Sequence, residues 1–315
     1  MKILILGANG FIGAPLLKRV LSEGHEARVL TRKETGSYPA GVEVFHGDLL
    51  DEALNTDALI ADCDVIFNCA GEIRNEALMS ALHVESTRRL LGAVKRRLAD
   101  DPEHRCHWVQ LSSVGAYGPS LGRARVVTED TQPNPVGMYE VTKTQADELV
   151  QEAGQIAGLT YAILRPSNVY GPRMPNNSLR QLAALIRRRI FFYVGFKRPV
   201  ATYIHVEDVV SGLMLCGFNP KSHGQIYNLS NDCFMDEMVD GLARAMNTSR
   251  PFLKLPETFV RSLVYVASKL VKLPVTQERV DALMVRTRYP SKKLESQLGF
   301  VAKYPVPETI GDILI

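Results

Sequence analysis

The chain has 315 residues, of which 46% are hydrophobic, and its formal net charge is only +3. This length exceeds that of one small compact unit, so we expect one large domain and a smaller lobe, with a substantial core. The basic residues are dispersed apart from the run at 187–189, so the sequence offers no electrostatic footprint for nucleic acid. We interpret that run as a solvated helix end rather than an anion site.

Cysteine usage and hydropathy predict a cytoplasmic protein. The five cysteines form no C-x-x-C pair and most lie in apolar stretches, as reduced thiols do, and none is expected to bind a metal. A strand-like run follows Met1 directly, without the pattern of an export signal. The apolar stretch 259–273 is interrupted by three basic residues and is shorter than the roughly 18 residues of a membrane span. We interpret it as an amphipathic helix packed over the substrate lobe, with a membrane-surface helix as the less favoured alternative, and expect no membrane contact.

Short β-branched runs alternate with longer segments of 3.6-residue period through the first half of the chain. The strands are expected near 2–6, 26–31, 42–46, 64–68, 106–112 and 160–165. The helices are expected near 11–23, 51–60, 77–98 and 138–157. Such alternation predicts an α/β fold with a doubly wound parallel sheet, the Rossmann arrangement.

The rhythm changes after Arg165 and Pro166, where proline and asparagine mark a loop before an expected helix at 178–189. Two later pieces, 203–216 and 225–229, again look like parts of the sheet domain. We therefore predict a dinucleotide-binding domain at 1–170 plus about 200–232. A smaller, mostly helical C-terminal substrate lobe would comprise 171–199 plus 233–315.

A glycine-rich turn, GANGFIG at 7–13, lies between the first strand and the first helix. Gly7, Gly10 and Gly13 would let the backbone approach a pyrophosphate, which the positive end of the helix then binds. An ordinary glycine-rich turn is the alternative, but the position after strand one favours dinucleotide binding.

The end of the second strand holds Thr31 and Arg32, where a cofactor with a free ribose 2′-hydroxyl usually meets a carboxylate. Because a guanidinium suits a 2′-phosphate, we favour NADP over NAD, with a merely solvated Arg32 as the alternative. Asp48 and Leu49 follow the third strand and Cys69, Ala70 and Gly71 follow the fourth, all at the carboxyl edge where ligands bind.

Ser112 and Ser113 close the fifth strand, and Tyr139 and Lys143 lie one turn apart on the next expected helix. A lysine ammonium next to a tyrosine is expected to lower the pKa of the phenol and make it an acid/base for hydride transfer to a ketone. A surface pair is the alternative. The dinucleotide motif and the serine-tipped strand favour the catalytic interpretation of Ser113, Tyr139 and Lys143.

These motifs together resemble the extended short-chain dehydrogenases/reductases of the nucleotide-sugar epimerase/dehydratase group. The matching runs, in order, are GANGFIG at 7–13, GDL at 47–49, NCAG at 68–71, SSVGAYG at 112–118, YEVTK at 139–143, LRPSNVYGP at 164–172, YIHVEDVV at 203–210 and KKLESQLGF at 292–300. The resemblance implies that Tyr139 is the acid/base, that Lys143 holds the nicotinamide ribose and tunes Tyr139, and that Ser113 binds the reacting oxygen. The expected cofactor contacts are Gly7, Asn9, Gly10, Phe11, Ile12, Gly13, Thr31, Arg32, Asp48, Leu49, Cys69, Ala70, Gly71, Tyr139, Lys143 and Pro166. Asn168 would touch the substrate's diphosphate.

Departures from that family's pattern bear on the reaction. Val114 and Gly115 follow Ser113 where sugar dehydratases carry acidic residues, so elimination of water lacks its acid and base. His83 stands where the family usually has an asparagine. Ala201 replaces an arginine of many epimerases. Lys197, Arg198 and Arg288, with Arg286 beside it, are the cations expected to replace the missing substrate contacts.

The favoured function is an NADP-dependent reductase acting on the 4-keto group of a nucleotide-activated deoxysugar. A nucleotide-sugar 4-epimerase with tightly bound NAD is the alternative, followed by a keto-reductase for a lipid-like or steroid-like substrate. A redox sensor that binds NADP without turnover is least favoured, because Tyr139, Lys143 and Ser113 are all present. We also expect a homodimer formed through the helices at 77–98 and 138–157. The residues expected to make the first of these helices adhesive are Leu78, Leu82, Leu90, Leu91 and Val94.

Overall fold

The computed structural model describes residues 1–33, 38–119, 124–270, 280–281 and 283–315. Its centre is a seven-stranded sheet in the order β12-β7-β5-β4-β1-β2-β3, with every neighbouring pair parallel. The strands are β1 (Lys2–Leu6), β2 (Glu26–Thr31), β3 (Val42–His46), β4 (Val65–Asn68), β5 (Cys106–Leu111), β7 (Leu159–Pro166) and β12 (Gln225–Leu229). Because the central strands are covered on both faces, they are continuous apolar runs rather than alternating ones.

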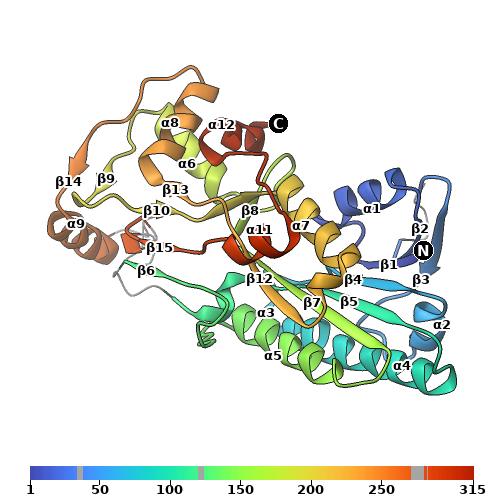
Figure 1. Cartoon of the computed structure of the whole chain (residues 1–315). Helices are drawn as coiled ribbons and strands as arrows, with labels where there is room; N and C mark the ends of the chain where they lie inside the picture. The colour runs from blue at the N-terminus through green and yellow to red at the C-terminus, as the bar shows by residue number, and fades with distance from the viewer. Residues whose placement is uncertain (34–37, 120–123, 271–279, 282) are drawn as a thin grey trace.

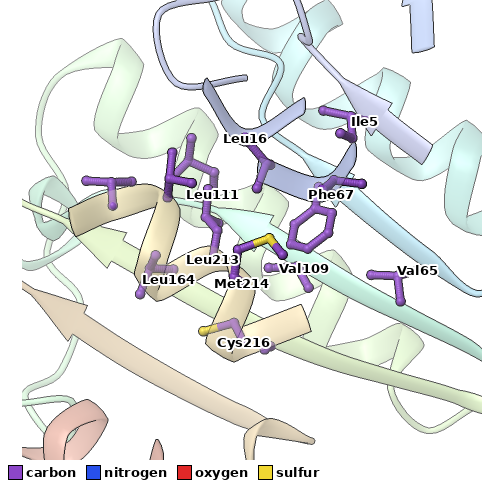
Figure 2. Packing of buried hydrophobic residues seen from close by; sticks show 14 of the residues in the cluster. Ile5, Leu16, Val65, Phe67, Val109, Leu111, Leu164, Leu213, Met214 and Cys216 are labelled. Carbon is purple, nitrogen blue, oxygen red and sulfur yellow. The ribbon is translucent and has the colours of Figure 1, made fainter. Parts of the chain in front are cut away.

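One face of the sheet is covered by α1 (Gly13–Ser22) and α7 (Val206–Phe218). Figure 2 shows this core, in which Leu16 of α1 and Leu213 of α7 meet Phe67 and Val109 of the sheet. The helix α7 lies close to the sheet because Gly217 leaves no room for a side chain: a Cβ there would lie 2.4 Å from the Phe67 ring.

The other face is covered by α2 (Thr56–Ile60), α4 (Ser86–Asp100) and α5 (Met138–Ala153), around the buried Trp108. In Figure 1 these helices line the opposite side of the sheet from α1 and α7. Helices on both faces of a parallel sheet give the Rossmann fold, and the fold prediction is confirmed.

A second body of structure lies beyond the carboxyl end of the sheet (Figure 1), with its own core around Met238 and Leu242. Its helices are α6 (Ser178–Arg187), α8 (Met235–Ala245), α9 (Glu257–Leu270) and α12 (Val306–Thr309), whereas α11 (Lys292–Leu298) packs on α7 and β12 in the core of the sheet domain. Its short strand pairs are β8 (Asn168–Tyr170) with β11 (Tyr203–His205), β9 (Tyr193–Val194) with β14 (Lys254–Leu255), β10 (Val200–Ala201) with β13 (Cys233–Phe234), and β6 (Arg125–Val126) with β15 (Thr287–Arg288). The 3₁₀ turns are η2 (Val114–Tyr117), η3 (Pro220–Ser222) and η4 (Ile310–Leu314).

Two helix predictions are wrong in detail. The helix expected from residue 51 begins only at Thr56, because the Asn55 side chain accepts the Ala58 N–H and caps it there. The helix expected at 77–98 is interrupted: α3 (Glu76–Met79) passes into the π-helix η1 (Ser80–Glu85) before α4. Wider turns of this kind are frequent at functional sites, and this one contains His83.

Five apolar residues of that segment were predicted to contact a second subunit, and for three of them the prediction is wrong. Leu90, Leu91 and Val94 are buried in the chain's own core against Trp108, so they are not available to a second subunit. The homodimer stays a prediction. None of the described helices is long and apolar enough to cross a membrane, and residues 271–273 of the predicted apolar helix lie outside the described residues.

Candidate active site

The glycine-rich turn between β1 and α1 is a closely packed cradle. Gly7 has a φ of +78°, and a Cβ there would lie 2.8 Å from the Cys69 carbonyl oxygen. A Cβ on Gly13 would lie 2.1 Å from the Gly7 oxygen. Both positions therefore need glycine, and they bring the turn against the Cys69-Ala70-Gly71 segment that follows β4. The residues present fit the pyrophosphate of a dinucleotide at the start of a helix.

Polar side chains link this turn to the end of β2. The Asn9 amide donates to the Thr31 hydroxyl at 3.1 Å, and the Tyr38 hydroxyl donates to Asn9 at 3.0 Å. Thr31 is buried and its oxygen also accepts the Lys33 N–H, so it fixes the loop. Its contact with a ribose stays a prediction. The contact of Tyr38 with Asn9 was not predicted, because no sequence motif marks a tyrosine in this loop.

Arg32 lies beside Asp48 in an open recess lined by Thr31, His46 and Gly47. The Arg32 guanidinium is 3.6 Å from the Asp48 carboxylate, and its side chain is largely exposed. The cation expected to bind a 2′-phosphate therefore already faces an anion. This geometry weakens the prediction of NADP, since the carboxylate that neutralises Arg32 would also repel a phosphate.

The helix α5 carries Tyr139, Lys143 and Asp147 at successive turns, so the three side chains share one face. Ser113 lies just after β5, where its oxygen accepts the Gly115 N–H at 3.0 Å and caps η2. Since the Ser113 oxygen accepts this bond, its hydroxyl hydrogen is left to donate to a substrate oxygen.

The electrostatics of Tyr139 differ from the prediction. Burial raises the pKa of the phenol to about 12, and the carboxylates of Glu140 and Asp147 act in the same direction. The expected lowering by Lys143 is not among these effects, and the Lys143 ammonium donates to the Leu111 carbonyl at 2.5 Å. Burial also lowers the pKa of Lys143, against the opposing effect of Asp147. The Tyr139 phenol is thus protonated at neutral pH and suited to donate a proton.

His83 contacts the edge of the Tyr139 ring, with ring centroids 5.7 Å apart. Its Nε2 accepts the Glu72 N–H at 2.9 Å, and its Nδ1 lies 2.8 Å from the Thr142 hydroxyl, which donates to the Met138 carbonyl. These partners define a neutral ring with the proton on Nδ1. Burial lowers the His83 pKa to about 4, so the ring stays neutral over the ordinary pH range. The sequence singled out His83 only as a departure.

A buried ion pair lies at the far end of the same helix face. Both Nε and Nη2 of Arg165 contact the Asp147 carboxylate, at 3.1 and 3.0 Å, and the Ser112 hydroxyl donates to the same oxygen at 2.7 Å. The Arg165 guanidinium also lies over the Tyr117 ring. This network holds α5, β5 and β7 together beneath Ser113 and was not predicted, because it depends on three segments distant in sequence.

Two of the expected substrate contacts, Arg198 and Arg288, lie together at the Phe234 ring of the second lobe. Asn168 is exposed and donates to the Thr202 carbonyl at 3.0 Å. Arg198 is paired with Asp236 at 2.7 Å and with Glu237, and its guanidinium lies 3.7 Å from the centre of the Phe234 ring. Lys197 is exposed, whereas Arg288 also lies over Phe234. Their roles in substrate binding stay predictions, as does that of the half-buried Arg286.

The sequence of residues 3–230 matches the family model described as the NAD dependent epimerase/dehydratase family. The chain is a member of this family. The match spans the cradle, the Ser113 turn, the helix α5 and all seven strands of the sheet. The chain is therefore an enzyme of the nucleotide-sugar epimerase/dehydratase type.

Relatives in the family carry out several reactions. The 4-hydroxy-2-methyl-3-oxo-4-farnesyl-3,4-dihydroquinoline-1-oxide ketoreductase of Stigmatella aurantiaca is 25% identical, covering 90% of this chain and 84% of the relative. The UDP-glucose 4-epimerase of Mycolicibacterium smegmatis is 27% identical, covering 73% and 77%. The crystal structure of UDP-glucuronic acid 4-epimerase from Bacillus cereus in complex with NAD has a TM-score of 0.73 and 19% identity, covering 99% of this chain and 97% of that chain. At 19% identity, the similarity to the Bacillus cereus structure shows a shared fold and nothing more.

Titratable side chains also lie near the Ser113 turn and in the 203–210 motif. The carboxylate of Glu140 occupies the space left by Gly115 and Gly137, so one acidic group lies near the Ser113 turn although Val114 and Gly115 follow the serine. His205 and Asp208 of the 203–210 motif hold the C-terminal segment, through stacking on Tyr304 and through the Lys303 N–H. Within the described residues no group of three or more His, Cys, Asp or Glu side chains is arranged to hold a metal.

Glu140 gives a test of the phenol's electrostatics. Because its carboxylate raises the pKa of Tyr139, Glu140→Gln should lower that pKa. Oxidation of an alcohol needs the deprotonated phenol, so its pH–rate profile should move to lower pH, by on the order of half a unit, since burial is unchanged. Initial rates of NAD reduction between pH 7 and 10 would measure the shift. An unchanged or opposite shift would contradict this view of Tyr139, and Glu148→Gln, on an exposed position of the same helix, is the control.

Proposed function

We propose that this enzyme reduces a ketone to a secondary alcohol, with NAD(P)H supplying the hydride and Tyr139 supplying the proton. The observation that carries the proposal is the half-buried Tyr139, whose phenol has a raised pKa, on the same helix face as Lys143. The Ser113 hydroxyl would donate a hydrogen bond to the ketone oxygen. As charge develops on that oxygen, Tyr139 transfers its proton and is then reprotonated from solvent, while Lys143 would hold the nicotinamide ribose.

Two other family reactions are less well supported by this site. Elimination of water needs an acid and a base beside the serine, where this chain has Val114 and Gly115, although the Glu140 side chain lies beside Gly115. A 4-epimerase must hold its keto intermediate and let it rotate between two hydride transfers. The ketoreductase relative aligns over a larger share of both chains than the 4-epimerase does, which favours one net hydride transfer.

For the substrate we propose a nucleotide-activated sugar with a 4-keto group, as the family membership favours. A lipid-like ketone is the second candidate. It is favoured by the farnesyl group named in the substrate of the Stigmatella relative and by the pairing of Arg198 with Asp236, which leaves fewer cations for a diphosphate. Steady-state rates with a 4-keto-6-deoxy sugar nucleotide and with a farnesylated ketone would discriminate the two substrate classes.

For the cofactor we propose NAD in preference to NADP, since Asp48 shares its recess with Arg32. Asp48→Asn should raise NADPH affinity roughly tenfold, because the repulsive charge is lost and Arg32 is freed. Asparagine retains the acceptor for the Leu50 N–H. Arg32→Ala, the matched control, should leave NADH binding almost unchanged and weaken NADPH roughly ten- to hundredfold. Titration of nucleotide fluorescence would measure both. If NADPH already binds the wild type more tightly, the choice of NAD is wrong.

The nucleotide retained by the purified protein tests reduction against epimerisation. A reductase exchanges its cofactor in each turnover, so denatured protein should release well under one nucleotide per chain, and the protein should bind added NADH reversibly. One firmly held NAD per chain, identified by mass and not removed by dialysis, would favour the 4-epimerase instead.

A further inference from the structure

The outer edge of the second lobe is built from three segments distant in sequence. The strand β9 pairs in parallel with β14, so that Tyr193 lies opposite Lys254. The inner side of α9 packs on this pair, where Val260 and Val264 are buried against Val194. Residues 185–197, 250–255 and 257–265 therefore form one continuous surface, which we call the lobe edge. It lies at the far end of the lobe from the sheet (Figure 1).

Large apolar side chains are exposed on each of the three segments of the lobe edge. Phe252 is 87% exposed, Phe196 is 73% exposed and Phe259 is 56% exposed. Leu185, Ile190 and Leu253 are exposed on the same segments. A single exposed leucine is ordinary, but a group of aromatic and aliphatic side chains on one module indicates a contact surface. The packed inner face of α9 is as the sequence predicts. The outer group could not be predicted, because it depends on three separate segments.

The charges around this apolar group are basic. Arg187, Arg188, Arg189, Lys197 and Lys254 are exposed, and within the described part of the chain none of them has an acidic partner. Glu257, the acidic residue of these segments, pairs with Arg261, which also pairs with Asp281 outside them. The lobe edge thus combines exposed aromatic rings with unpaired cations. That combination is suited to the interface of a bilayer whose headgroups are negatively charged.

We propose that the lobe edge is a docking surface for an anionic phospholipid bilayer, on which the enzyme lies peripherally. Phe196, Phe252 and Phe259 would enter the headgroup region, while the cations of 187–189 and Lys254 contact the phosphates. The catalytic residues lie on α5 and at the end of β5, outside this surface. The inference therefore does not depend on the reaction proposed above, and either can fail while the other holds.

Vesicle sedimentation with the full chain tests the proposal. At 0.1 M salt the protein should pellet with phosphatidylcholine vesicles that contain 30 mol% phosphatidylglycerol, and much less with phosphatidylcholine alone. Removing two basic contacts with Arg188→Glu/Lys254→Glu should weaken binding on the order of thirtyfold. Phe252→Ser should weaken it roughly tenfold, since it removes one inserted ring. High salt should weaken the wild type. The matched controls are Lys95→Glu and Val301→Ser, which change exposed residues outside the lobe edge.

Each variant is first checked for unchanged NADH binding and melting temperature, so that loss of vesicle binding is not loss of fold. Equal binding of the wild type and Arg188→Glu/Lys254→Glu would overturn the proposal, as would failure of the wild type to pellet with anionic vesicles. A dimeric mass without vesicles that Phe252→Ser converts to a monomer, with no vesicle binding by the wild type, would assign the surface to a second copy of the chain instead.

Discussion

Replacing Tyr139 with phenylalanine should lower ketone reduction by a factor on the order of 10² to 10⁴, because the substitution removes only the hydroxyl that donates the proton. The ring and its edge contact with His83 are retained, so the helix should not move. Cofactor affinity should stay within about threefold of the wild type, since no cationic or hydrogen-bonded contact of the cradle is changed. Single-turnover oxidation of NADH, followed by absorbance, measures the chemical step.

The control for this variant is Tyr161→Phe, which removes the hydroxyl of a half-buried tyrosine on β7. It should turn over normally. Near-normal turnover of Tyr139→Phe would refute the assigned role. Lys143→Ala should reduce turnover at least as much, because it removes the side chain proposed to hold the nicotinamide ribose and also the contact with Leu111.

Replacing Asp147 with asparagine should lower the free energy of unfolding by about 3–5 kcal/mol, because Arg165 is then left as a buried charge without a counter-ion. The loss is expected to be large since both side chains are almost fully buried. Urea denaturation at pH 7, followed by the fluorescence of the single Trp108, would measure it.

The double variant Asp147→Leu/Arg165→Met is the control, because it removes both charges together. Replacement of a buried ion pair by apolar groups is often neutral, so most of the stability should return. A double variant as unstable as Asp147→Asn would show that Ser112 or packing around Tyr117, and not the unpaired charge, causes the loss.

The parallel sheet and the cradle could be predicted from the sequence, because their signals are local. Apolar strands buried on both faces are short runs of the chain, and Gly7 and Gly13 are required by contacts within one turn and its neighbouring strand. That Tyr139 and Lys143 share one face of a helix could be predicted for the same reason, since the two residues are one helical turn apart.

The remaining features depend on distances that no local pattern contains. The pKa of Tyr139 was predicted in the wrong direction, because adjacency to Lys143 in sequence does not show that the ammonium contacts Leu111. The neutral state of His83 depends on Glu72 and Thr142, which come from two other segments. Arg32 looked like a phosphate ligand until Asp48 was placed beside it.

Transfer of a labelled hydride tests the central claim most directly. The protein is mixed with NADH carrying deuterium at C4 of the nicotinamide and with a 4-keto-6-deoxy sugar nucleotide or, in parallel, a farnesylated ketone. We predict that one deuterium appears on the former carbonyl carbon for each NADH oxidised, with Tyr139→Phe strongly impaired. Interconversion of two sugar epimers without net oxidation of NADH and without deuterium in the product would contradict the account and identify an epimerase.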